Sequence, residues 1–229
     1  MKLPLILSLP HAGTSVPKEV MEYNLLTHEQ IVEDGDEGAD EIFNFNDTVE
    51  SYVTTDIARA FIDINRAPDD IRDDGVVKTK TCMNAPIYNA PLPEMLINKV
   101  IAKYHTPYHE RLTALSRNVA AGIDCHTMFA TSPPNSAVPG IPRPHICLGN
   151  GDGTCPVNWI EEMANCFRKQ FGETNVLIND PFSGGYIIRK HFSEIPWIQI
   201  EVSRGQFMTN AEKRRKVFSA IESWVRSIQ

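Results

Sequence analysis

Short, mostly apolar runs recur along this chain, and they constrain its fold more than any other sequence feature. Each run spans three to five residues and does not alternate strictly between apolar and polar positions. Continuous runs of this length are typical of strands whose two faces are both covered. The six expected strands are Leu5–Leu9, Phe61–Ile64, Ala120–Asp124, His145–Leu148, Val176–Ile178 and Ile198–Val202.

Helical patterns lie between these runs, with apolar residues spaced to fall on one face of a helix. They cover Leu96–Leu115 with a kink or break expected at Pro107, Pro156–Phe171, and the residues after a capping box of Thr209 and Glu212. Strands that alternate with helices predict an α/β fold. We expect one domain over residues 1–229, built on a mixed, mostly parallel sheet with helices on both faces.

Composition excludes several classes of protein and partner. The 229 residues are 42% hydrophobic and 22% charged, which is ordinary for a folded domain. The formal net charge of -7 lacks the basic footprint of a nucleic-acid binder. No apolar stretch approaches the roughly 18 residues that a membrane span requires. The sequence therefore predicts neither nucleic acid nor a membrane as a partner.

The five cysteines bear on the compartment in which the protein works. Their number is odd, and no Cys-x-x-Cys pair occurs. This pattern argues against a disulfide framework and against a structural zinc knuckle. Reduced thiols are typical of cytosolic proteins, so we expect a cytoplasmic location.

Two long segments without an apolar pattern are expected to be loops. Asp69–Lys80 is polar, and Thr131–Pro144 contains five prolines. Long loops in compact domains often cover functional sites.

Polar side chains that can carry chemistry follow several of the expected strands. In open α/β sheets, ligands gather at the carboxyl ends of the strands, so these side chains are expected at one edge. In chain order they are His11, Asn65 with Arg66, His126, and Glu201 with Arg204, and a loop with Gly184 and Gly185 follows another expected strand. This convergence is more informative than any single motif.

His11 and His126 are predicted to be metal ligands. Two histidines, one carboxylate and an open fourth position form the ligand set of a hydrolytic zinc site. The third ligand stays open at this point, because Asp34, Asp36, Glu37, Asp40 and Glu41 crowd one segment. Asp36 and Asp40 would share one face if the segment is helical. The prediction is one divalent ion per chain, with zinc the expected metal.

Glu201 is the expected general base, because a carboxylate within a buried strand is costly unless it is paired or functional. The alternative is an ion pair with Arg204 or Arg66. A second histidine pair, His105 and His109, has the four-residue spacing that can bind metal, but a partly exposed helix face explains it as well.

Six short motifs occur in the order seen in N-formylglutamate amidohydrolases, and the chain resembles that family over nearly its whole length. The motifs are Pro10–Gly13, Asp36–Asp40, Asp63–Arg66, Asp124–Thr127, Asn179–Tyr186 and Gln199–Glu201. The resemblance implies the phosphorylase/hydrolase-like α/β fold that zinc carboxypeptidases share. It also implies hydrolysis of an N-formyl or N-acyl amino acid such as N-formylglutamate.

The resemblance also assigns roles. It supports His11 and His126 as metal ligands and Glu201 as the base, and Asn65 with Arg66 looks like the carboxypeptidase pair that binds a substrate carboxylate. Zinc carboxypeptidases bind their metal through the histidine and glutamate of a His-x-x-Glu motif.

Thr14 stands where the Glu of that motif would be, so the remaining metal ligand must come from elsewhere. Asp36 is the choice by its position in the family's acidic motif, with Glu37 and Asp40 as alternatives.

The substrate is expected to be a small N-acyl amino acid. Arg66 would bind its α-carboxylate with the help of Asn65, and the loop around Gly184 and Gly185 would close on it, since paired glycines permit close backbone approach. Arg204 could bind a second carboxylate.

Two other functions compete with this one. The first is a zinc carboxypeptidase or another amidase on a peptide-like substrate, and the second is a non-catalytic binding protein that kept the fold. The intact set of two histidines, a carboxylate, Glu201 and Arg66 argues against the second.

Overall fold

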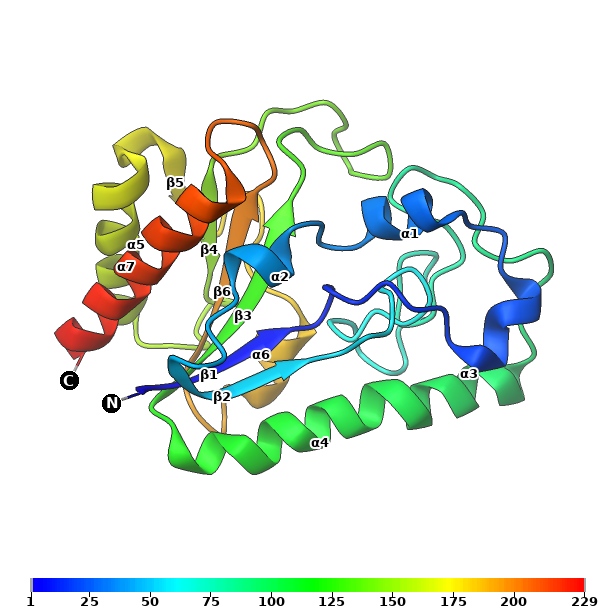
Figure 1. Ribbon diagram of the computed structural model, residues 1–229. Helices are drawn as coiled ribbons and strands as arrows, with labels where there is room; N and C mark the ends of the chain where they lie inside the picture. Colours follow the sequence, from blue (N-terminus) through cyan, green and yellow to red (C-terminus); the bar gives the residue numbers. More distant parts are fainter. Residues whose placement is uncertain (1, 229) are drawn as a thin grey trace.

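Six strands form one twisted sheet in the computed structural model, which describes residues 2–228 (Figure 1). The strands lie in the order β2-β1-β3-β6-β4-β5. Their bounds are β1 Leu3–Leu9, β2 Val49–Thr54, β3 Ala121–Met128, β4 Ile146–Gly149, β5 Val176–Ile178 and β6 Trp197–Ser203. β2, β1, β3 and β6 are parallel, whereas β4 is antiparallel to β6 and parallel to β5.

Helices cover both faces of this sheet. The α-helices are α1 His28–Asp34, α2 Ala39–Ile42, α3 Glu94–Val100, α4 Thr106–Leu115, α5 Val157–Phe171, α6 Tyr186–His191 and α7 Asn210–Ile228. Shorter helical turns are η1 Lys18–Tyr23, η2 Ile101–His105, η3 Ser116–Asn118 and η4 Glu173–Asn175. α5 and α7 pack on one face, and α4 and α6 on the other (Figure 1). The expected fold class, a mixed and mostly parallel sheet with helices on both faces, is confirmed.

The apolar runs build two cores because successive side chains of a strand point to opposite faces. Leu5 and Leu7 of β1 pack into the core beneath α5 and α7. Ile6 packs into the other core, which includes Leu112 of α4 and Ile188 of α6. Because both faces of such a strand are buried, its sequence is apolar throughout and does not alternate between apolar and polar residues.

The prediction of a strand over Phe61–Ile64 is wrong. The sixth strand of the sheet is β2, which the sequence did not predict. Residues 61–66 form turns and irregular backbone, although Phe61, Ile62 and Ile64 are buried in the α4 core. Their burial produced an apolar run without strand pairing. β2 is an edge strand that mixes buried and exposed positions, so it shows no continuous apolar run.

The long helical stretch is interrupted before Pro107 by a wider turn. α3 continues through η2, a π-helical turn, into α4, which has Pro107 in its first turn. Proline lacks the N–H that the carbonyl four residues earlier would accept from. The expected break therefore takes the form of a local change in helical pitch. The predicted capping box at α7 is present, because the Glu212 amide donates to Thr209 Oγ1 and the Thr209 amide donates to Glu212 Oε2.

All five cysteines are buried and free. Among residues 2–228, no helix combines the length and the apolar character needed to cross a membrane.

Candidate metal centre and substrate cavity

Three of the predicted site residues meet at the carboxyl edge of the parallel strands. His11 follows the end of β1 by two residues, and His126 lies in β3. In the register of β3 with β6, His126 stands directly opposite Glu201. Neighbouring strands at matched positions direct side chains to the same face. The sheet itself therefore brings one histidine beside the predicted base.

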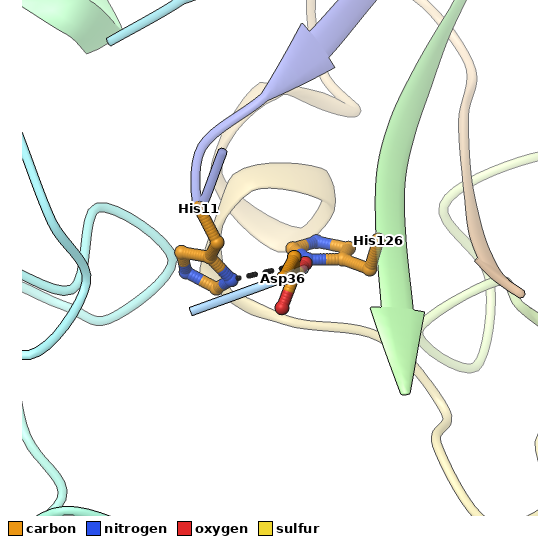
Figure 2. A group of neighbouring side chains, drawn as sticks. All are labelled: His11, Asp36 and His126. Atoms are coloured by element: carbon orange, nitrogen blue, oxygen red, sulfur yellow. Dashed lines mark hydrogen bonds and ion pairs between the residues drawn. The ribbon is translucent and has the colours of Figure 1, made fainter. Parts of the chain in front are cut away.

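Asp36 completes a group with the two histidines (Figure 2). Its amide donates to the His11 carbonyl at 3.0 Å, which fixes the segment beside β1. Asp36 Oδ2 lies 2.8 Å from His126 Nδ1 and 3.5 Å from His11 Nδ1. The candidate ligand atoms all lie within 4.8 Å of one another, and all three residues are buried.

The other acidic residues of this segment point elsewhere. Asp34 forms a buried ion pair with Lys78, whose Nζ lies 2.7 and 2.8 Å from the two carboxylate oxygens. Glu37 and Asp40 are exposed, and Glu41 accepts from the Asn210 amide. The geometry therefore brings Asp36, and not these neighbours, to the histidines.

Two further buried aspartates orient the histidine rings. His11 Nε2 donates to Asp63 Oδ1 at 2.8 Å, and His126 Nε2 donates to Asp124 Oδ2 at 2.8 Å. A carboxylate at Nε2 places the ring hydrogen there and leaves the Nδ1 lone pair free. Sequence reasoning assigned no role to Asp63 or Asp124, although each is a carboxylate inside an apolar run, a costly placement that signals a partner.

These contacts fit a bound divalent cation. His11 Nδ1 is buried and has no hydrogen-bond partner, and it faces the Asp36 carboxylate. Ligand atoms about 2 Å from a tetrahedral ion lie roughly 3.3 Å apart. The 2.8 and 3.5 Å separations at Asp36 bracket that spacing. Imidazole nitrogens with a carboxylate are also the donor set that zinc prefers in proteins.

The charge around the group favours a cation as well. Burial by itself would lower the pKa of His126, yet Asp124 and Asp36 together raise that pKa well above its ordinary value. Arg59 is the cation nearest these carboxylates, with its Nε 3.0 Å from Asp63 Oδ2. Three buried carboxylates therefore surround the two imidazoles, and Arg59 offsets part of their charge.

We expect Asp124→Asn to weaken zinc binding about 10- to 100-fold, because outer contacts of metal-binding histidines typically contribute that much. The asparagine amide can present N–H to Nε2 and so oppose the ring tautomer that frees Nδ1. The measurement is a competition titration of zinc against a chelator. Asp47→Asn, at an exposed position, is the control. Equal zinc affinity in Asp124→Asn and wild type would contradict the orienting role.

Glu201 is 7% exposed and carries no ion pair with either of the arginines considered for it. Its Oε1 accepts from Gln199 Nε2 at 2.9 Å. Burial raises the pKa of Glu201 to about 7. A carboxylate with such a pKa can take up and release a proton near neutral pH, as a general base must.

Arg66 and Asn65 sit beside the cluster but make different contacts. Arg66 lines the cavity, with Nε donating to the Asp74 carbonyl at 3.0 Å and a loose 3.7 Å approach of Nη2 to the Asp74 carboxylate. The Asn65 side chain is engaged internally, since Nδ2 donates to Asp124 and Oδ1 accepts from the Ile187 amide. Arg66 Nη1 also donates to the Asn65 carbonyl at 3.3 Å and lies 4.0 Å from Asp63 Oδ2, so a ligand at Arg66 would compete with these contacts, whereas Asn65 braces the segment.

Arg204 holds the Asp36 segment in place. Its Nε donates to Thr127 Oγ1, and its terminal nitrogens donate to the Glu33 and Gly35 carbonyls. Its guanidinium also lies 3.7 Å from Asp36 Oδ1. The second carboxylate expected at Arg204 would have to compete with these contacts.

A cavity of about 880 Å³ opens over the cluster. Both long loops predicted from the sequence contribute to its wall, 69–80 with Asp74 and Lys78, and 131–144 with Arg143. Arg143 was missed by sequence reasoning, because nothing in its proline-rich surroundings marks it. Its guanidinium lies 4.8 Å from the Phe182 ring centroid, and its Nε is buried without a hydrogen-bond partner.

Gly184 and Gly185 line the same cavity, and each position requires glycine for a different reason. Gly184 has φ +127°, a conformation that other residues rarely adopt. A Cβ on Gly185 would clash with the Asn65 side chain. The Gly185 amide donates to Gln199 Oε1 at 2.7 Å, so Gln199 links this turn to Glu201.

Comparison with known proteins gives consistent matches. A sequence model of N-formylglutamate amidohydrolase matches residues 3–208. An N-formylglutamate deformylase from Pseudomonas putida is 24% identical over 233 residues, which cover 92% of this chain and 84% of that protein.

Two solved structures share the fold. The N-formylglutamate amidohydrolase of Ralstonia eutropha JMP134 superposes with a TM-score of 0.79 at 22% identity, covering 99% of this chain and 93% of that one. A gene product of Agrobacterium tumefaciens superposes with a TM-score of 0.75 at 15% identity, covering 100% of this chain and 91% of that one.

Proposed function

The chain belongs to the N-formylglutamate amidohydrolase family, and from this premise we propose that it hydrolyses the amide of an N-formyl or N-acyl amino acid with the help of one bound zinc ion. The observation that carries the proposal is the His11, Asp36 and His126 group with Glu201 on the neighbouring strand. The products are a carboxylic acid, formate for an N-formyl substrate, and the free amino acid.

His11, Asp36 and His126 would hold the metal through Nδ1, Oδ2 and Nδ1. A divalent ion at this position would polarise an amide carbonyl and lower the pKa of a water molecule. Asp63 and Asp124 accept the hydrogen at Nε2 of the two rings, which leaves each Nδ1 to the metal position. With a metal bound, the chain would supply two imidazole nitrogens and one carboxylate oxygen.

Glu201 would accept a proton from the attacking water and deliver it to the departing nitrogen. Its burial disfavours the charged form, which makes the carboxylate a stronger base. Gln199 donates to Oε1 and so orients the carboxylate, leaving Oε2 for the proton. Proton delivery to nitrogen is needed because an amide anion is a poor leaving group.

Arg66 would bind the α-carboxylate of the substrate, since it lines the cavity and its Nη2 makes only a loose 3.7 Å approach to Asp74, which a substrate carboxylate could replace. Arg143 is our candidate for a second carboxylate, such as that of a glutamyl side chain, because no acidic side chain pairs with it within residues 2–228. Cation–π stacking on Phe182 holds its guanidinium plane while leaving donors free.

A substrate panel tests this function. We expect zinc-loaded protein to hydrolyse N-formylglutamate faster than N-formylmethionine, because Arg143 recognises a second carboxylate. Arg143→Met should lower kcat/KM for N-formylglutamate about tenfold or more and change N-formylmethionine little. Release of formate and amino acid is measured directly. Cleavage of a C-terminal peptide bond without deformylation would instead support a carboxypeptidase, and no hydrolysis of any substrate would support a binding protein.

A further inference from the structure

Three consecutive backbone carbonyls leading to Arg66 are each held by a hydrogen bond. The Ile64 carbonyl accepts from His109 Nε2 at 3.0 Å, and the Arg66 carbonyl accepts from His105 Nε2 at 2.8 Å. Between them, the Asn65 carbonyl accepts from the Tyr186 amide at 3.3 Å. We call residues 63–66 the arginine segment.

These bonds satisfy backbone carbonyls that neighbouring strands would satisfy within a sheet. The arginine segment lies outside the sheet, so its buried carbonyls need hydrogen-bond partners from elsewhere, because a buried carbonyl without one is destabilising. His105 and His109 are 3% and 4% exposed, and they do not form the exposed helix face that the sequence allowed. They also lie outside the His11, Asp36 and His126 group. Their contacts are with the backbone on either side of Asn65.

The positions of the ring hydrogens follow from these partners. A carbonyl only accepts, so Nε2 of His105 and Nε2 of His109 must both carry hydrogen. Burial, together with the neighbouring His105 and His191, lowers the pKa of His109 to about 3, so its ring is neutral and its Nδ1 accepts. His191 Nε2 then donates to His109 Nδ1 at 2.9 Å.

Glu194 contacts His191 on the side away from His109. Its Oε2 lies 3.1 Å from His191 Nδ1, and its Oε1 accepts from Thr113 at 2.8 Å. The rings of His109 and His191 stack with centroids 5.2 Å apart. One rotamer and one tautomer of His109 therefore satisfy every contact around it.

We propose that His105 and His109 are positioning residues that hold the arginine segment so that Arg66 meets a substrate carboxylate at the cavity wall. The proposal rests on the proposed function in its second half, the role of Arg66. Its first half, that the two imidazoles fix the backbone of residues 63–66, stands on the hydrogen bonds alone. Neither ring touches the substrate, and each acts through the backbone.

The test compares donor-removing and donor-keeping variants in the full chain. His105→Leu and His109→Leu remove the donor and keep bulk, whereas His105→Gln and His109→Gln keep an N–H near the position of Nε2. Leu112→Ala is the control for general loss of stability, because Leu112 is a buried residue of α4 whose side chain cannot donate a hydrogen bond to these carbonyls. The first readout is backbone hydrogen exchange of residues 63–66, whose amides at Asp63, Asn65 and Arg66 are all bonded.

We expect the leucine variants to speed this local exchange at least about tenfold beyond Leu112→Ala, and the glutamine variants to restore most of the protection. Exchange equal to that of Leu112→Ala would contradict the proposal that the two imidazoles fix the backbone of residues 63–66.

The second readout is kinetic and separates KM from kcat. We expect the leucine variants to raise KM for N-formylglutamate about 10- to 100-fold, because small misplacements of a binding group cost that much, and to change hydrolysis of its α-amide less than about twofold. Equal losses on both substrates would overturn the role of Arg66 in the proposal. If wild type hydrolyses neither substrate, the proposed function fails. The exchange result still tests whether His105 and His109 fix the backbone of residues 63–66.

Discussion

Glu201→Gln is expected to lower kcat about 10²–10⁴-fold while zinc stays bound. Glutamine keeps the size of the side chain and can still contact Gln199, but it cannot accept a proton. The position in β6 opposite His126 puts the lost group beside the proposed metal ligands and not among them. Steady-state hydrolysis of N-formylglutamate and elemental analysis of the same sample check both halves of the expectation.

Two outcomes would reassign Glu201. Retained turnover would mean that another carboxylate takes the proton, and loss of zinc would make Glu201 a ligand. Glu161→Gln, on the exposed side of α5, changes charge by the same amount far from the cavity and serves as the matched control.

Arg66→Met is expected to lower kcat/KM for N-formylglutamate about 10²–10³-fold, or about 3–4 kcal/mol. The variant leaves a substrate carboxylate without its paired donors inside a cavity lined by other charged groups. Arg66→Lys should restore part of this loss, since a point charge cannot reproduce the two parallel hydrogen bonds. Arg215→Met, at an exposed position in α7, is the control.

The role of Arg66 is also tested by changing the substrate, with hydrolysis of N-formylglutamate compared with hydrolysis of its α-amide. Wild type should favour the free carboxylate by a factor similar to the loss in Arg66→Met. In Arg66→Met the two substrates should become nearly equal. Equal hydrolysis of both by wild type would rule out carboxylate recognition at Arg66.

The sequence was sufficient to place His11, His126 and Glu201 together. His11 lies two residues beyond β1, and His126 and Glu201 lie two residues before the ends of β3 and β6; parallel strands bring their carboxyl ends to one edge. This inference needs only local patterns and one topological rule. It did not depend on knowing which strands are neighbours.

Positions set by irregular backbone could not be predicted in the same way. Phe61–Ile64 is as buried as a strand, but it pairs with no strand, and its Ile64 carbonyl accepts from His109 of α4 instead. Asp36 was one of several acidic residues in its segment, and only the bond from its amide to His11 and the contacts of Arg204 distinguish it. Such contacts join residues far apart in the chain and leave no periodic trace.

The arginines show the same limit. Arg204 follows a strand and so looked available, but it is engaged by the Glu33 and Gly35 carbonyls. Arg143 lies in a loop without a pattern, yet among the four arginines that line the cavity it is the one whose guanidinium has no acidic partner within residues 2–228. Whether a cation is free for a ligand depends on long-range partners, which a single sequence does not reveal.

Metal content of protein purified without an affinity tag tests the central claim most directly. Elemental analysis should find about one equivalent of zinc per chain in wild type and in Glu37→Ala, an exposed neighbour, and much less in Asp36→Ala. Removal of the metal by a chelator should abolish hydrolysis, and one equivalent of zinc should restore it. Full activity in metal-free protein, or full metal content in Asp36→Ala, would contradict the account.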